Sequence, residues 1–164
     1  MESQNYLGIY ISKNTATIVC LGPQKSDGNA MKCFSVSLEE QQQDMQALAG
    51  LIAQGCEKRN LRFSEVTVAL DCSMFMQHSV HSEFNEPKQI AATVRFDTEE
   101  ALATDITNVA VAFEIASSDQ TGSQLTVFTV ERKILSEVLD ALQQYNLDER
   151  SGQGFVNDSN NKRW

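Results

Sequence analysis

The stretch Tyr6–Leu21, YLGIYISKNTATIVCL, decides the fold, because it joins two apolar segments through the polar turn Ser12–Asn14. This pattern predicts a β-hairpin of residues 6–11 and 15–21. The first segment is almost uniformly apolar, which is typical of a strand covered on both faces of its sheet. In many phosphate-binding proteins such a hairpin carries an acidic residue and a glycine at its tip, so the turn is a candidate nucleotide site.

The elements expected after the hairpin follow from hydrophobic periodicity and from turn-forming residues. Residues 30–38 predict a third strand, in which a phase slip indicates a bulge. Pro87, just behind Asn85, favours the start of a helix with Ile90 and Val94 in its buried stripe. The remaining predictions are a helix over 42–59 that stops at Asn60, strands within 64–71 and 73–84, paired strands at 108–116 and 123–131, and a helix around 134–145.

The order βββαβ followed by βαββα predicts an α/β chain in which a three-strand meander precedes the first helix. We expect residues 1–70 to form a βββαβ subdomain and residues 71–147 to form a βαββα subdomain. Residues 148–164 have no hydrophobic period and few apolar side chains, which predicts a loose tail.

Charge and cysteine content narrow the classes of partner. The 164 residues include 13 basic and 22 acidic side chains, a formal net charge of -9 that disfavours nucleic acid and anionic lipid as ligands. Four widely spaced cysteines (Cys20, Cys33, Cys56 and Cys72) fit neither a metal knuckle nor a disulfide framework, so we expect reduced thiols and a cytoplasmic location. The sequence contains no signal-peptide pattern and no apolar run of transmembrane length, so we expect neither export nor membrane insertion.

No cofactor, metal or catalytic residue is predicted from the histidines, cysteines and glycines. His78 and His81 are the only histidines, and on a strand their spacing places them on opposite faces. Nothing marks Cys72 as an activated nucleophile, so we expect it to pack against neighbouring side chains. Neither of the glycine-rich phosphate-binding motifs, GxGxxG and GxxxxGKS, occurs in the chain.

Acidic residues are the remaining candidates for chemistry. A two-metal nuclease of this topology would need an acidic residue in the first strand, where metal-bridging carboxylates converge, and that strand has none. The candidates elsewhere are Asp71 at a strand end, Asp97, Glu99 and Glu100 on the second helix, and Glu114 and Glu131 in the late strands. Such a set is typical of a solvated surface.

Three stretches carry a resemblance to a known family: LGIYISKNTATIVCL at 7–21, PKQIAATVRFDTEEALATDITNVAVAFEI at 87–115 and LTVFTVERKILSEVLDALQQYNL at 125–147. Together they resemble the N-terminal half of the PilM family of type IV pilus assembly and the related cytoplasmic domain of the type II secretion protein GspL. The resemblance covers residues 6 to 147 and implies half of an actin-like, ribonuclease H-like fold.

The chain departs from this family at the hairpin. Tyr10 stands where the family has its phosphate-and-metal aspartate, and Ser12 stands where a glycine lets the backbone approach a phosphate. The resemblance therefore implies a turn that has lost its nucleotide chemistry, and no functional residue of the family is carried over.

We expect a noncatalytic scaffold that binds the cytoplasmic tail of an inner-membrane assembly protein and is peripheral at that membrane through its partners. Phe84 and Phe96 lie off the expected core stripes and are the candidate contact residues; the alternative is that they pack between the two subdomains. Three other functions stay open: a divergent nucleotide phosphotransferase, a ribonuclease H-like nuclease, and an excised half of an actin-like ATPase. A homodimer is also an open alternative.

Overall fold

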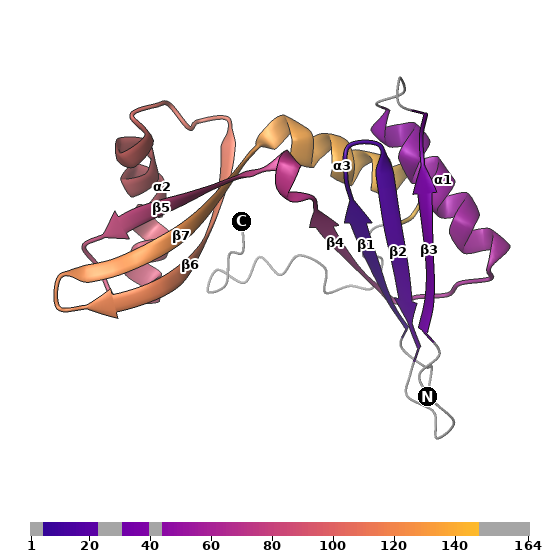
Figure 1. The fold of residues 1–164 in the computed structure, drawn as a ribbon, viewed down its shortest axis with the longest axis horizontal. Helices are drawn as coiled ribbons and strands as arrows, with labels where there is room; N and C mark the ends of the chain where they lie inside the picture. The colour runs from indigo at the N-terminus through magenta and orange to yellow at the C-terminus, as the bar shows by residue number, and fades with distance from the viewer. Residues whose placement is uncertain (1–4, 23–30, 40–43, 148–164) are drawn as a thin grey trace. The chain divides into compact units, whose positions relative to one another are not determined.

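The computed structural model describes residues 5–22, 31–39 and 44–147; the expected tail, 148–164, lies outside them. The elements are β1 (Tyr6–Ile11), β2 (Thr15–Leu21), β3 (Met31–Ser37), α1 (Met45–Lys58), β4 (Glu65–Leu70), the short 3-10 helix η1 (Cys72–Met74), β5 (Met76–Ser82), α2 (Pro87–Leu102), β6 (Val109–Asp119), β7 (Gly122–Glu131) and α3 (Arg132–Gln144) (Figure 1). This order confirms the predicted α/β class, βββαβ followed by βαββα.

The described chain divides into two compact units. Unit 1 contains the residues up to Met74 together with those from Ser136 onward, and unit 2 is Phe75–Leu135. The expected subdomains divided the chain at residue 70 and placed the last helix wholly in the second one. In the structure most of α3 belongs to unit 1, because its apolar residues pack on the first sheet.

Unit 1 is built on a four-stranded sheet of order β3-β2-β1-β4. The predicted hairpin is confirmed: β1 and β2 are antiparallel, with Tyr6 opposite Leu21, and Ser12 N–H donates to Thr15 O at 2.9 Å across the turn. Strand β4 returns after α1 and pairs parallel with β1, as expected when a helix connects two strands of one sheet. Tyr10 is thereby opposite Ala69.

One face of this sheet is covered by α1 and α3, and their side chains form a single core with the inward side chains of the strands. The core contains Leu7, Ile9, Ile11, Ala16, Ile18, Cys20, Phe34, Leu48, Ile52, Val66, Val138, Ala141 and Leu142. Along β1 the burial alternates, so the prediction that this strand is covered on both faces is wrong for the described chain. Apolar side chains on the second face of β1 do not by themselves supply a layer to cover them.

We call the second face of this sheet the open face. It consists of Tyr6, Gly8 and Tyr10 on β1, Thr15, Thr17, Val19 and Leu21 on β2, Met31, Cys33, Ser35 and Ser37 on β3, and Glu65, Thr67 and Ala69 on β4. The pairing of β3 with β2 is regular from Met31 to Ser37, so the bulge predicted in β3 is absent.

Helix α1 is Met45–Lys58, within the predicted range 42–59, and its end at Asn60 is as predicted. The Asp44 side chain accepts a hydrogen bond from Gln46 N–H at 2.9 Å and caps the N-terminus. At the other end Asn60 adopts a left-handed conformation (φ 49°), which confirms it as the stop.

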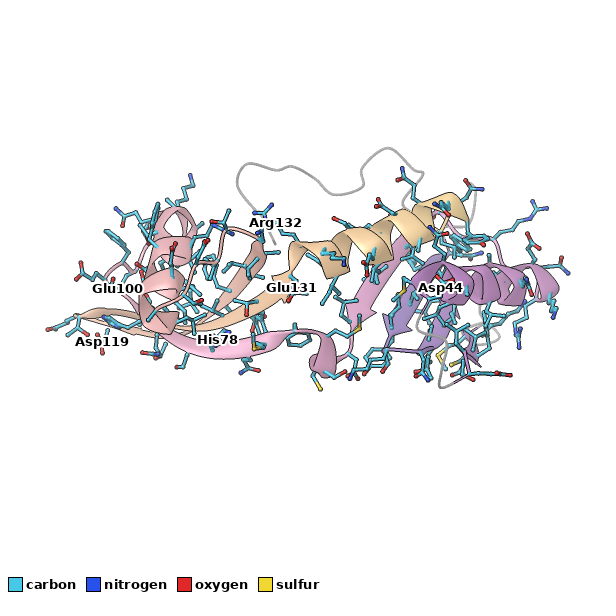
Figure 2. All side chains as sticks on the ribbon, turned by 90° about the horizontal axis from the view of Figure 1, so that it is seen from above. Asp44, His78, Glu100, Asp119, Glu131 and Arg132 are labelled. Carbon is cyan, nitrogen blue, oxygen red and sulfur yellow. The ribbon has the colours of Figure 1, made fainter. Side chains whose placement is uncertain are left out.

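Unit 2 is a three-stranded antiparallel sheet of order β5-β7-β6 with α2 on one face. The predicted β6–β7 hairpin is confirmed, with Asp119 at its tip (Figure 2). Its turn is closed by Asp119 Oδ1, which accepts Thr121 N–H at 2.7 Å, and by Gly122 at φ 131°. The core consists of Val80, Ile90, Val94, Ile106, Val111, Leu125 and Val127.

The start of α2 differs in detail from the prediction. Pro87 is the first helical residue, as expected, but the N-cap is Glu86, whose side chain makes no capping bond. Asn85 instead bridges to the hairpin, because its Nδ2 donates to Asp119 O and its Oδ1 accepts from Ser123 Oγ, both at 2.8 Å. The buried stripe is Ile90, Val94 and Thr98.

Candidate functional sites at a strand end and on helix α2

The carboxyl ends of the parallel strands β1 and β4 meet at the position where folds of this kind bind ligands. Asp71 follows β4 directly, and its N–H donates to Ile11 O at 2.8 Å, which holds Asp71 beside the end of β1. The Tyr10 hydroxyl donates a hydrogen bond to Asp71 Oδ2. The side chain in the family's aspartate position therefore reaches the acidic residue of the neighbouring strand.

Asp71 is held as a carboxylate by its neighbours. Hydrogen bonds from the Ser73 side chain, from Tyr10 and from Ser73 N–H, the last at 2.9 Å, lower the pKa of Asp71 to about 2. Lys13, in the hairpin turn, lowers it further. The same contact raises the pKa of Tyr10, because the phenol must stay protonated to donate to the carboxylate.

This strand end offers a metal few ligands. Magnesium and calcium take six or more oxygen ligands, of which carboxylates supply the charge. Here both oxygens of Asp71 already accept hydrogen bonds from Tyr10 and Ser73. The other acidic candidates (Asp97, Glu99, Glu100, Glu114 and Glu131) all belong to unit 2. Within residues 5–22, 31–39 and 44–147 no three histidine, cysteine or acidic side chains gather as metal ligands.

The histidines and Cys72 occupy separate positions. His78 and His81 lie on opposite faces of β5, as expected from their spacing, and His78 Nε2 is 2.9 Å from Thr129 Oγ1. The expectation that Cys72 packs against neighbours is wrong. Cys72 is exposed, because it lies in η1, past the end of β4 and outside the layer that α1 and α3 cover.

Phe96 is the most exposed large apolar side chain of the described residues, at 71%. It borders a shallow hollow of about 540 Å³ at the C-terminal end of α2. We call this hollow the Phe96 surface; it is lined by Phe96, Glu99, Glu100, Ala103, Thr104 and Asp105. An exposed aromatic ring surrounded by three carboxylates suits a ligand with apolar and cationic groups.

The chain that follows α2 forms one edge of the Phe96 surface. Ala103 ends α2 in a left-handed conformation with φ 49°, which turns the chain out of the helix. Asp105 Oδ1 accepts Thr107 Oγ1 at 2.5 Å and Thr107 N–H at 2.8 Å, and these bonds lower the pKa of Asp105. Arg95 donates to Ile106 O at 2.7 Å and so ties the following loop to the helix.

Phe84, the second predicted contact residue, does not line the Phe96 surface. It follows β5, is 36% exposed, and its N–H donates to Ser82 Oγ at 3.4 Å. Phe96 is nine residue steps after Pro87, the first residue of α2, which corresponds to a rise of roughly 13 Å. Phe84 therefore precedes the N-terminus of α2, whereas Phe96 lies in its C-terminal half.

The contact between Tyr10 and Asp71 was missed from the sequence, although each residue was singled out. A signal for it exists: β3, α1 and β4 form a strand–helix–strand unit, which places β4 parallel to β3, and the meander places β3 parallel to β1. Residues that end β1 and β4 then meet at one edge of the sheet.

These features define the chain as an α/β protein with a four-stranded mixed sheet covered by α1 and α3 and a three-stranded antiparallel sheet covered by α2. The structure is similar to that of a PilM–PilN type IV pilus biogenesis complex, with a TM-score of 0.69 and 20% identity over 85% of this chain and 44% of the other. It is also similar to the cytoplasmic domain of EpsL, an inner-membrane component of the type II secretion system of Vibrio cholerae, with a TM-score of 0.60 and 18% identity over 87% of this chain and 54% of the other. The predicted resemblance to PilM and GspL is thus confirmed as a likeness of fold.

The chain spans about half the length of these two solved structures. No protein-family model and no curated protein matches its sequence. Among the described residues, no helix combines the length and the apolar character needed to cross a membrane.

Proposed function

We propose that this chain is a noncatalytic adaptor in an inner-membrane assembly of the type IV pilus or type II secretion kind. The observation that carries the proposal is the Tyr10–Asp71 hydrogen bond. It occupies the strand end at which a nucleotide site of this fold would need free carboxylates and an open backbone. The fold likeness to PilM and to the EpsL cytoplasmic domain supports the choice of assembly.

The proposed partner is the cytoplasmic tail of an inner-membrane assembly protein. Cytoplasmic segments next to membrane spans carry an excess of lysine and arginine. Such a tail complements the net charge of -9 and the carboxylates of the Phe96 surface. Phe96 then supplies the aromatic anchor that protein interfaces favour, and the chain works in the cytoplasm, held at the membrane through its partner.

The noncatalytic part is tested by thermal denaturation with magnesium and ATP. We expect no change in melting temperature, whereas a ligand at 100 times its dissociation constant stabilises a fold by about 2.7 kcal/mol. Two variants locate any effect: Asp71→Asn removes the carboxylate charge, and Tyr10→Phe removes only the hydroxyl. Stabilisation of the wild-type chain that Asp71→Asn abolishes would show a working nucleotide site and overturn this part.

The adaptor part is tested with a synthetic peptide that has the sequence of the cytoplasmic tail of an inner-membrane assembly protein. We expect Phe96→Ala to weaken binding of this peptide by about tenfold or more in calorimetry. Phe84→Ala is the matched control, because Phe84 lies outside the Phe96 surface. The unfolding temperature of Phe96→Ala should stay near that of the wild type, since Phe96 is 71% exposed.

Charge gives a second test of the same surface. Glu99→Gln combined with Glu100→Gln should weaken tail binding and reduce its salt dependence, because two carboxylates facing the basic peptide are neutralised. A tail that binds with equal affinity to the wild type, to Phe96→Ala and to the Glu99/Glu100 variant would exclude the Phe96 surface.

A further inference from the structure

The open face of the unit 1 sheet carries an apolar surface that the described chain leaves uncovered. Tyr6, Leu21 and Met31 are paired across β1, β2 and β3 and form one continuous row. Tyr6 and Leu21 are each 44% exposed and Met31 is 63% exposed. Glu65 is the one charged side chain among the open-face positions. Contiguous exposed apolar rows of this kind mark interaction sites.

The composition of β1 supports the same conclusion. The sheet is mixed, with one parallel and two antiparallel pairs, and near-continuous apolar sequence is typical of strands that are buried on both faces. Strand β1 has this composition, YLGIYI, yet only its inward residues are buried. The composition of β1 thus suits a second layer that the described residues do not supply.

Gly8, at the centre of the open face, is an independent observation. Glycine in a strand interior weakens the strand and often marks the close approach of a ligand or another backbone. Nothing in the fold itself requires glycine here: a Cβ at this position would meet only Val19 O, at 3.8 Å, and its φ is not positive. The missing side chain leaves free space on the open face.

We propose that the open face binds an amphipathic helix of a partner protein, with its apolar side over Gly8 and basic residues toward Glu65. This goes beyond the adaptor function proposed above and does not depend on the Phe96 surface. A helix is about 10–12 Å in diameter, and four strands spaced about 4.8 Å apart present a width of about 14 Å, so one helix fits across the sheet.

Charge favours such a helix over a second copy of this chain. Two copies packed through their open faces would bury both Glu65 carboxylates, and neither face carries a cation to pair with them. Each copy would also bring a net charge of -9. A helix with basic flanks removes both costs, because its cations pair with Glu65 at the rim.

Cys33 provides a direct probe, since it is exposed and lies on the open face in the same row as Gly8 and Val19. Cys72 is also exposed but lies in η1, so it serves as the internal control. Cys20 and Cys56 are buried, and burial raises the pKa of both thiols, that of Cys56 to about 11, so they react slowly.

The experiment measures thiol labelling of the 164-residue chain with and without a designed peptide. The peptide has about 18 residues of Leu, Ala and Lys with leucines at helical spacing, and a scrambled peptide of equal composition is its control. We expect the amphipathic peptide to slow labelling of Cys33 about tenfold, as at nine-tenths occupancy, and to leave Cys72 unaffected.

Two variants keep the test independent of folding. Gly8→Val adds a β-branched side chain at the centre of the face, where only Val19 O is near, so the chain should fold and lose the protection. Leu21→Ser with Met31→Ser should also lose it. Phe96→Ala should retain the full protection, which separates this proposal from the adaptor proposal.

Three results would overturn the proposal. Failure of the amphipathic peptide to protect Cys33, or equal protection by the scrambled one, would exclude a helix site. Protection that grows with the concentration of the chain alone would identify a second copy as the occupant. Slow labelling of Cys33 in the dilute chain without peptide would show that the chain covers its own open face.

Discussion

The two units share one architecture, a sheet with helices on one face, but they differ in what the other face presents. The open face of unit 1 is apolar, with Tyr6, Leu21 and Met31 exposed. The corresponding face of unit 2 carries polar side chains, among them Gln77, Ser79, His81, Gln124 and Thr126. Antiparallel sheets commonly have one solvated, polar face of this kind, whereas the near-continuous apolar sequence of β1 is typical of a strand covered on both faces.

Side chains on the second face of the unit 2 sheet also contact one another within that unit. Gln124 Nε2 donates to Ser79 Oγ at 2.8 Å across β7 and β5. The large aromatic residue of that face, Phe128, packs edge-on against Phe75, with ring centroids 5.8 Å apart. Among the described residues, unit 2 thus forms two layers with a largely polar second face, whereas unit 1 has the composition of a three-layer unit of which the described residues supply two layers.

The largest expected effect separates the covered face of unit 1 from its open face. Ile18→Ala removes a fully buried side chain from β2 and should lower the free energy of unfolding by about 3 kcal/mol, because it leaves a cavity under α1 and α3. Leu21→Ala, on the same strand but 44% exposed, should cost less than about 1 kcal/mol. Urea denaturation of both variants measures the difference. Equal losses would mean that the open face is buried in solution.

The second prediction compares one glycine from each sheet. Gly122→Ala should destabilise by about 2 kcal/mol, because φ is 131° and the new Cβ would stand 2.1 Å from Ser82 O. Gly8→Ala should be neutral or stabilise by about 0.5 kcal/mol, since its φ is ordinary and its surroundings are open. Thermal unfolding of the two variants and the wild type measures both effects. Destabilisation by Gly8→Ala would mean that the fold itself requires this glycine.

The positions of the strands in both units could be predicted from sequence periodicity, but the number of layers that cover each sheet could not. The alternation of apolar and polar residues placed most strands of both units, and the turn-forming residues 117–123 placed the β6–β7 hairpin. Strand β1 was expected to be covered on both faces because it is almost uniformly apolar. Apolar composition shows that a strand can be buried on both faces, but it does not show that a covering layer is present. The burial of Thr98 was not predicted either, because its side chain is polar. In the structure its hydroxyl donates a hydrogen bond to Val94 O at 2.6 Å, which allows it to be buried.

The candidate sites were predicted less completely than the fold. Phe96 is exposed as its position off the core stripe predicted, but the carboxylates around it come partly from the loop after α2, whose path depends on Ala103 and Arg95. The Tyr10–Asp71 contact depends on strand order, which periodicity does not contain. The first case depends on the local path of a loop and the second on topology, and a pattern along one segment reports neither.

The third prediction concerns pH at the strand end of unit 1. The folded-state pKa of Asp71 is lowered to about 2, below its ordinary value near 4. The stability it contributes is therefore complete above pH 4 and is lost as the pH falls from 4 toward 2. Asp71→Asn should remove this part of the acid dependence, as measured by unfolding between pH 2 and 5.

The alkaline side gives the matching measurement. The hydrogen bond to Asp71 raises the pKa of Tyr10, so its contribution is present below its unfolded pKa near 10 and is lost as the pH rises through the higher folded value. The difference in tyrosinate absorbance between wild type and Tyr10→Phe isolates this residue. In Asp71→Asn the Tyr10 titration should move to lower pH. An unchanged titration would contradict the Tyr10–Asp71 contact.

The smallest effect is expected on the second face of the unit 2 sheet. Thr126 lies on β7 opposite Ser79 and Glu114, and its side chain points away from α2. Thr126→Val keeps the shape and the strand propensity while removing the hydroxyl, so the free energy of unfolding should change by less than about 0.5 kcal/mol. The same change should leave peptide protection of Cys33 intact. A large loss at Thr126 would mean that this face, too, is buried against another layer, and the contrast between the two sheets would then fail.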